Sequence, residues 1–218
     1  MSYKYALFDL DGTLVNTKEG ILNGFAYALD YLNIKYKDKE ELKIHIGPPL
    51  TYTFSDYYKL DKDTTLLAVK KYREFYKDKG MYQCKLYDGI NELLIKLKKQ
   101  NIKIAVSTSK AIVFAEAILK KHNIYDYFNF ISGSELDGSR EKKEEVIKYA
   151  LEGLGVKDKN QVIMIGDRCF DIEGARKNNI DSVGVLWGFG NEEEFLKYNS
   201  TYIVSNTNEL FDVINKRG

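Results

Sequence analysis

The chain has 218 residues, a formal net charge of +1, 44% hydrophobic residues and 30% charged residues. This balance is typical of a globular protein with a sizeable core, and it lacks the positive excess that binding to a nucleic acid polymer requires. No apolar stretch approaches the roughly 18 residues that span a bilayer, and no signal-peptide pattern is visible. The two cysteines, Cys84 and Cys169, have no CxxC spacing, so we expect reduced thiols in a cytoplasmic protein with no membrane partner.

Short apolar runs alternate with amphipathic segments along most of the chain. The runs that predict buried strands are Tyr5–Phe8, Ile102–Val106, Phe128–Ile131, Val162–Ile165, Ser182–Leu186 and Tyr202–Val204. Between them, apolar residues recur at helical spacing, as in Ile90, Leu93, Leu94 and Leu97. Strands that alternate with such helices favour the α/β class, with a doubly wound parallel sheet covered on both faces.

One connection is much longer than the others. About 95 residues separate Asp11 from Ser107, whereas a strand–helix–strand crossover needs only some 30 residues. Apolar stripes at helical spacing fill much of the excess, and the GPPL sequence at Gly47–Leu50 marks a break between them. We therefore predict a catalytic core of residues 1–16 and 83–218, with a small α-helical cap domain at residues 17–82. A cap inserted beside a strand's carboxyl end is placed to act as a substrate lid.

The stretch FDLDGTL, Phe8 to Leu14, places two carboxylates where the first strand gives way to a turn. Asp9 and Asp11 are two residues apart, so their side chains would lie on one side of the chain, ~6–7 Å apart. Two like charges at that distance repel by roughly 3 kcal/mol at an effective dielectric constant of about 20. A bound cation would turn this repulsion into coordination.

Other polar stretches also follow predicted strands. They are STSK at Ser107–Lys110, the basic pair Lys142 and Lys143, and GDRCFD at Gly166–Asp171. Since the carboxyl ends of parallel strands share one sheet edge, we expect Asp167 and Asp171 to join Asp9 and Asp11 there. Clustered carboxylates are the ligands that Mg²⁺ prefers. We further expect Thr108–Lys110 to open a helix and form an anion site, which together with the metal indicates phosphoryl transfer.

These four ordered stretches resemble the motifs of the haloacid dehalogenase (HAD) superfamily. The resemblance covers nearly the whole chain, and it is strongest to phosphoglycolate phosphatase-like members, which carry a helical cap after the first motif. It implies a Rossmann-like core and a Mg²⁺-dependent hydrolase that acts on phosphoric monoesters. In such enzymes Asp9 would attack phosphorus to form an aspartyl-phosphate. Asp11 would protonate the leaving oxygen and then deprotonate the attacking water.

The resemblance also implies a metal and phosphate site. Magnesium would be held by Asp9, the backbone carbonyl of Asp11 and Asp167, with Asp171 as an indirect or water-mediated partner. Thr108 and Ser109 match the phosphate-binding hydroxyl position, and the neighbouring serines leave its register open by one residue. Lys143 matches the phosphate-binding lysine better than Lys142 does, by its distance from the preceding GSR sequence.

The substrate is expected to be a small phosphorylated metabolite, such as phosphoglycolate or a nucleoside monophosphate. Asp11 favours phosphate esters over haloacids, because dehalogenases lack an acid at this position. A phosphosugar mutase or a pyrophosphatase of the same superfamily is the alternative, and a non-catalytic phosphate-binding regulator is the remaining one. Lys18 and Tyr52 are the candidate substrate contacts from the cap. We expect a monomer or a homodimer.

Other residues that could carry chemistry have simpler interpretations. His45 and His122 are the only histidines, and a surface or capping role is expected for both. Cys169 is expected to pack at a helix start rather than to act as a nucleophile. Trp187 and the Gly188–Gly190 sequence are expected to close the strand that precedes them.

Overall fold

The structure is a computed structural model that describes residues 3–215. Its strands are β1 (Tyr5–Phe8), β2 (Val15–Asn16), β3 (Lys85–Leu86), β4 (Lys103–Ala111), β5 (Phe130–Ser134), β6 (Val162–Gly166), β7 (Asp181–Val185) and β8 (Tyr202–Val204). Its α-helices are α1 (Lys18–Tyr31), α2 (Leu50–Tyr52), α3 (Lys62–Asp78), α4 (Ile90–Lys99), α5 (Ile112–Lys121), α6 (Lys143–Gly153), α7 (Cys169–Lys177), α8 (Glu192–Lys197) and α9 (Thr207–Asn215). Within the described residues, no helix combines the length and the apolar character needed to cross a membrane.

The chain divides into two compact units, which we call the core unit and the helical unit. The core unit contains the chain up to Val15 and from Leu86 onward, and the helical unit is Asn16–Lys85. The predicted cap at residues 17–82 lies inside the helical unit, whose edges fall one residue earlier and three residues later. The chain leaves the core unit through β2 and returns to it through β3, and these two strands pair in a two-stranded sheet.

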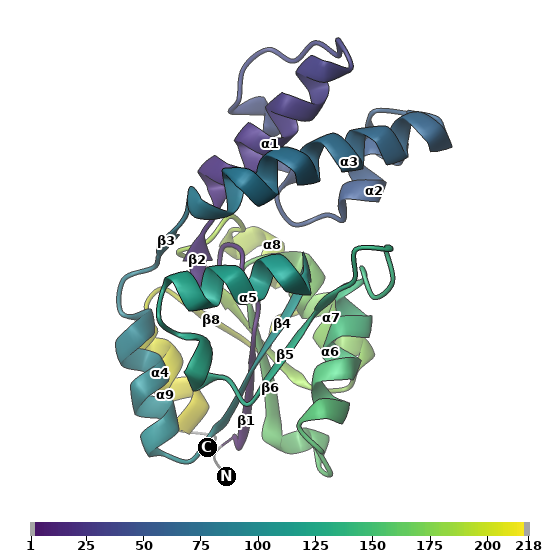
Figure 1. Ribbon diagram of the computed structural model, residues 1–218. Helices are drawn as coiled ribbons and strands as arrows, with labels where there is room; N and C mark the ends of the chain where they lie inside the picture. The colour runs from purple at the N-terminus through teal and green to yellow at the C-terminus, as the bar shows by residue number, and fades with distance from the viewer. Residues whose placement is uncertain (1–2, 216–218) are drawn as a thin grey trace. The chain divides into compact units, whose positions relative to one another are not determined.

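A six-stranded parallel sheet organises the core unit, in the order β5-β4-β1-β6-β7-β8 (Figure 1). The strand β1 lies centrally, and the chain continues first to one side of it and then to the other. This reversal creates a topological switch point beside β1, where open α/β sheets bind ligands at the carboxyl ends of the strands. The predicted doubly wound α/β fold is confirmed.

Helices cover both faces of this sheet, as its apolar strands require. The helices α6 and α7 pack on one face, and α4, α5 and α9 pack on the other. On the α6–α7 face, Leu7 of β1 and Met164 of β6 join Ile147 of α6 and Ala175 of α7 in one buried cluster. The central strands are thereby fixed on both faces, and so are the residues that follow them.

One local prediction at this edge is wrong. Thr108–Lys110 do not open a helix, because β4 continues to Ala111 and α5 begins only at Ile112. Ser107 and Ala111 both pair with β5, across a register shift that lets the strand continue past the polar residues. The backbone N–H groups at this position therefore belong to an irregular strand and not to a helix terminus.

The helical unit has an aromatic core of its own. Phe25 of α1 is fully buried, with its ring centroid 5.1 Å from that of His45 and 5.6 Å from that of Phe54. His45 is 4% exposed, and its Nε2 atom lies 2.9 Å from the Tyr58 hydroxyl oxygen. The expected surface role of His45 is therefore wrong, because aromatic residues from several turns enclose it. Burial lowers the pKa of His45 to about 4, so its ring is neutral at physiological pH.

We expect Phe25→Ala to destabilise the helical unit strongly, because it leaves a cavity among aromatic rings. Large-to-small changes of this kind lower the free energy of unfolding by about 3–5 kcal/mol. Tyr31→Ala on the same helix is the matched control, since Tyr31 is 52% exposed. The free energy of unfolding of both variants is measured by urea denaturation, with circular dichroism as the signal. Equal losses of stability would contradict the assignment of Phe25 to a core.

Candidate active site

Acidic side chains converge at the carboxyl edge of the sheet, at the switch point. Asp9 follows β1, Asp167 follows β6, and Asp171 lies in the first turn of α7. Ligand oxygens from these three residues lie within 4.8 Å of one another. Asp167 and Asp171 are fully buried, and Asp9 is 8% exposed. The structure thus brings together three of the four carboxylates that the sequence placed at this edge.

Lys143, the first residue of α6, extends into this cluster. Its Nζ atom lies 2.8 Å from Asp9 Oδ1 and 2.9 Å from Asp171 Oδ1, and it donates to the Ser107 carbonyl oxygen at 3.3 Å. Burial alone would lower the pKa of the ammonium group, but Asp171 and Asp9 outweigh that effect and raise it. Lys143 therefore stays charged and ties two carboxylates together. Lys142 is the N-cap residue of α6, so the geometry favours Lys143 of the two.

The two carboxylate oxygens of Asp9 have different surroundings. Oδ1 lies beside Lys143 and also accepts a hydrogen bond from the Leu10 N–H at 2.8 Å. Oδ2 accepts no hydrogen bond from any residue in the range 3–215. Burial, opposed by Lys143 and reinforced by Asp171, raises the pKa of Asp9 from 3.8 to about 6. One oxygen is thus fixed, and the other remains available to react.

Asp167 is held by the loop after β1 and by the chain after β7. Its Oδ1 atom accepts a hydrogen bond from the Thr13 hydroxyl at 3.2 Å, and its Oδ2 atom accepts one from the Phe189 N–H at 2.9 Å. Gly12, at φ +78°, leaves the space that Asp167 occupies, because a Cβ atom there would lie 2.1 Å from Asp167 Oδ2. Burial, with Asp171 and Asp9 nearby, raises the pKa of Asp167 well above its ordinary value.

The donor set of this cluster fits a divalent cation. Three carboxylates and one ammonium group carry a net charge of about −2 when all are ionised. Two oxygens that share one Mg²⁺ at 2.0–2.1 Å lie roughly 3–4 Å apart, which needs little change from the separations present here. Burial is the main cause of the raised pKa values of Asp9 and Asp167, and Asp171 adds a smaller contribution from this unbalanced negative charge. An oxygen-liganded divalent ion would relieve it.

Asp11 lies at the same edge but pairs with a different cation. Its Oδ2 atom is 2.9 Å from the Nζ atom of Lys110, whose side chain is 8% exposed. Its Oδ1 atom is buried without a hydrogen-bond partner among the described residues. A buried oxygen of this kind is available to a proton or a ligand. The side chain of Asp11 is therefore separate from the three-carboxylate cluster.

The hydroxyl groups of β4 complete the edge. Thr108 is 1% exposed, and its Oγ1 atom accepts a hydrogen bond from the Lys110 N–H at 3.2 Å, which leaves the hydroxyl proton to donate. Ser109 is half-buried, and its carbonyl oxygen accepts a hydrogen bond from the Ser134 hydroxyl. The Ser107 hydroxyl is buried with no partner among residues 3–215. All three hydroxyl positions remain candidates for an anion contact.

The two candidate substrate contacts of the helical unit have different surroundings. The Nζ atom of Lys18 lies 3.1 Å from a carboxylate oxygen of Glu40, at the wall of a cavity of about 550 Å³ within the helical unit. Tyr52 does not line that cavity and is 55% exposed. A substrate contact by Lys18 or Tyr52 therefore remains a prediction.

The sequence motifs did not identify several residues that hold the aspartates. Thr13 and Phe189 donate to Asp167, and Glu194 of α8 accepts hydrogen bonds from the Arg168 Nε–H at 3.1 Å and the Cys169 N–H at 2.6 Å. Glu194 thereby fixes the turn that follows Asp167. Its position, some 25 residues downstream of the motif, carries no local signal. The glycines on either side of Phe189 are the one sequence feature that is typical of a close backbone approach.

Comparison with known proteins places this site in a family. The family described as "Haloacid dehalogenase-like hydrolase" matches residues 6–185. The chain belongs to this family. It is a HAD-like hydrolase, and the motif resemblance noted in the sequence is confirmed.

Relatives of this HAD-like hydrolase carry several names. The chain is 38% identical over 214 residues to a "5'-nucleotidase" of Pseudomonas aeruginosa, with 98% of this chain and 96% of that protein covered. The crystal structure of a predicted phosphatase from Clostridium acetobutylicum has a TM-score of 0.94 and 44% identity, and covers 97% of this chain and 98% of its own. The "Tyrosine-protein kinase PtkA" of Mycobacterium tuberculosis is 34% identical over 94% of this chain and 69% of that protein.

The raised pKa of Asp9 predicts how stability depends on pH in magnesium-free buffer. The unfolded chain releases this proton near pH 4 and the folded protein near pH 6. The free energy of unfolding should therefore fall as pH rises from about 4 to 6, by up to about 3 kcal/mol from Asp9. Added MgCl₂ should raise the melting temperature more at pH 7 than at pH 5.

Thermal melts of the wild type and of Asp9→Asn at several pH values test this prediction. The variant cannot titrate at this position, so the difference between the two curves isolates Asp9. A difference that is constant between pH 4 and 6 would contradict the prediction.

Proposed function

We propose that this HAD-like hydrolase is a Mg²⁺-dependent phosphatase that cleaves a small phosphate monoester through an aspartyl-phosphate on Asp9. The observation that carries the proposal is the asymmetry of Asp9, whose Oδ1 atom is held by Lys143 and Leu10 while its Oδ2 atom accepts no hydrogen bond from residues 3–215. A carboxylate fixed at one oxygen and free at the other suits in-line attack on phosphorus. We also propose that the protein is cytoplasmic and that it is a monomer or a homodimer.

Asp9, Asp167 and the backbone carbonyl of Asp11 would hold the magnesium ion. When bound, the ion neutralises charge on the phosphoryl oxygens and helps to align them. Asp171 supports this arrangement indirectly, because it shares Lys143 with Asp9 and accepts a hydrogen bond from the Arg168 N–H at 3.1 Å. Thr108 and Ser109, with Lys143, would contact the phosphoryl oxygens that face away from the carboxylates.

The first half-reaction transfers the phosphoryl group to the enzyme. Asp9 Oδ2 forms a bond to phosphorus as the bond from phosphorus to the ester oxygen breaks. Asp11 would act as the general acid and give a proton to the departing oxygen, so the alcohol leaves neutral. In the second half-reaction Asp11 takes a proton from water, which attacks phosphorus and releases inorganic phosphate and the Asp9 carboxylate. Each group returns to its starting state.

The substrate class that we propose to test first is nucleoside 5'-monophosphates. The similarity to a protein named 5'-nucleotidase, over nearly the full length of both chains, supports this choice. Phosphoglycolate and pyrophosphate are the other candidates, because the phosphoryl site is compatible with them. Lys18 and Tyr52 of the helical unit are the proposed contacts to the part of the substrate beyond the phosphate.

A second candidate function is transfer of the phosphoryl group to a hydroxyl acceptor other than water. The similarity to a protein named tyrosine-protein kinase favours including this candidate, and a phosphosugar mutase would also transfer to a hydroxyl. Incubation with a phosphate donor and either a tyrosine-containing peptide or a sugar bisphosphate separates the outcomes. Free phosphate alone supports the hydrolase, whereas a phosphorylated peptide or an isomerised sugar monophosphate supports transfer.

Asp9→Asn should abolish turnover, because an amide cannot form the aspartyl-phosphate. We expect a loss on the order of 10⁴-fold or more in kcat for p-nitrophenyl phosphate and for adenosine 5'-monophosphate, measured as released phosphate with MgCl₂ present. Asp63→Asn, on the exposed first turn of α3, is the control and should keep full activity. A variant at Asp9 that retains wild-type kcat would overturn the proposed function.

Asp11→Asn should slow poor leaving groups more than good ones. Alkyl phosphates need a proton on the departing oxygen, so kcat/KM should fall by about 10²–10⁴-fold for these esters. For p-nitrophenyl phosphate, whose leaving group is stable as an anion, the loss should be smaller in the step that breaks the ester bond. Rapid-quench measurement of the first turnover provides that comparison. An equal loss for both kinds of ester would contradict the role of Asp11 as general acid.

A further inference from the structure

The segment between β7 and α8, Trp187–Gly190, encloses Asp167. The Phe189 N–H donates to Asp167 Oδ2 at 2.9 Å, and the Gly190 N–H donates to the Asp167 backbone oxygen at 3.0 Å. Two consecutive backbone groups of one loop therefore bind the side chain and the main chain of the same residue. The carboxylate cannot rotate without breaking the first of these hydrogen bonds.

The fit of this segment against Asp167 leaves no spare volume. A Cβ atom added to Gly188 would lie 2.2 Å from the Asp167 Cβ atom and 2.5 Å from the Gly12 carbonyl oxygen. Both contacts are far inside van der Waals separation, so the segment can approach Asp167 only because residue 188 is a glycine. The loop after β1 and the segment after β7 thus meet around one carboxylate.

Trp187 connects these two parts of the chain. Its indole Nε1–H donates to the Thr13 carbonyl oxygen at 3.0 Å, across 174 positions of sequence. The Thr13 hydroxyl in turn donates to Asp167 Oδ1 at 3.2 Å. One residue therefore anchors both donors to Asp167, since it binds Thr13 directly and lies two positions before Phe189.

We propose that Trp187 is a positioning residue, which sets the orientation of the Asp167 carboxylate toward a divalent cation by tying Thr13 to the segment that carries Phe189. This inference rests on the proposed function, because it assumes that Asp167 is a metal ligand. Trp187 itself makes none of the three hydrogen bonds to Asp167 described above. Outer partners that orient a metal ligand typically affect metal affinity by about 10–100-fold when they are removed.

The chain contains one tryptophan, so the indole reports on this position without any label. We expect MgCl₂ to shift both the fluorescence emission of Trp187 and the single indole N–H cross-peak in a ¹⁵N-correlation NMR spectrum. Both changes should saturate at the dissociation constant that calorimetry gives, and both should be absent in Asp167→Asn. Saturable binding of Mg²⁺ with no change in either signal would overturn the inference, and this measurement needs no substitution at Trp187.

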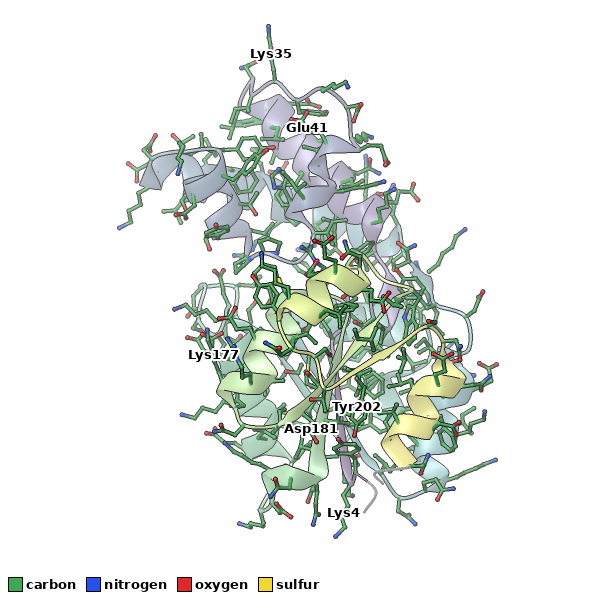
Figure 2. The ribbon with its side chains drawn as sticks, turned by 180° about the vertical axis from the view of Figure 1, so that it is seen from behind. Lys4, Lys35, Glu41, Lys177, Asp181 and Tyr202 are labelled. Carbon is green, nitrogen blue, oxygen red and sulfur yellow. The ribbon has the colours of Figure 1, made fainter. Side chains whose placement is uncertain are left out.

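Trp187→Phe removes the N–H donor and keeps an aromatic ring. We expect isothermal titration calorimetry to show Mg²⁺ binding weakened by about tenfold. Tyr3→Phe is the matched control, since it removes the hydrogen bond from the buried Tyr3 hydroxyl to Asp181 at the amino end of β7. Figure 2 labels Asp181 of β7 and Tyr202 of the neighbouring strand β8. The control should lower the melting temperature and leave the Mg²⁺ affinity unchanged.

The outcomes separate this inference from the proposed function. Trp187→Phe with a Mg²⁺ affinity within twofold of the wild type would overturn the positioning role and leave the metal site intact. Mg²⁺ affinity reduced equally in Tyr3→Phe would show that general loss of stability is the cause, and would also overturn it. A wild type that binds no Mg²⁺, or an Asp9→Asn variant that retains full turnover, would instead contradict the proposed function itself.

Discussion

The candidate active site is built around one electrostatic constraint, which is the repulsion among Asp9, Asp167 and Asp171 around a single ammonium group. Lys143 bonds to two of these carboxylates and cannot neutralise three. Burial strengthens the repulsion among the carboxylates, because charges removed from water interact more strongly and lose their hydration. Burial is the main cause of the raised pKa values of Asp9 and Asp167, and the neighbouring carboxylates add to it. A site of this kind is costly to keep without a cation, which indicates that its purpose is binding rather than stability.

The parallel sheet of the core unit holds these carboxylates close together despite their repulsion. The strands β1 and β6 are neighbours, and their registers bring Phe8 beside Ile165, so that Asp9 and the chain leading to Asp167 leave the sheet together. Apolar side chains buried on both faces hold these strands in place. The packing of many buried apolar residues in the core unit, rather than any favourable interaction among the carboxylates, therefore stabilises this arrangement of like charges.

Much of this arrangement could be predicted from local sequence, and the missing parts share a physical cause. The strand pattern and the ends of parallel strands were enough to gather Asp9, Asp167 and Asp171 at one edge, because that step needs only topology. The link from Trp187 to Thr13 and the bonds from Glu194 to the turn after Asp167 could not be predicted, since they join segments with no common periodicity. The helix expected at Thr108 was displaced because pairing with β5 outweighed local preference. His45 was misplaced because burial depends on neighbours that sequence spacing does not reveal.

In the function that we propose, the chemistry and the choice of substrate lie on different parts of the chain, and this separation has a physical basis. The carboxylate cluster, Lys143 and Thr108 would recognise only a phosphoryl group, which every candidate ester presents in the same form. Discrimination among esters requires contacts that differ between them. One methylene in an apolar contact changes selectivity by roughly 10–200-fold, and one buried hydrogen bond left unpaired changes it by up to about 10⁴–10⁵-fold. We propose that the helical unit supplies such contacts, and its exposed aromatic residues include Tyr52 and Tyr57. On this proposal, substitutions that redirect the enzyme to another ester would fall within the helical unit, Asn16–Lys85, because a change among the aspartates would alter the rate for all esters alike.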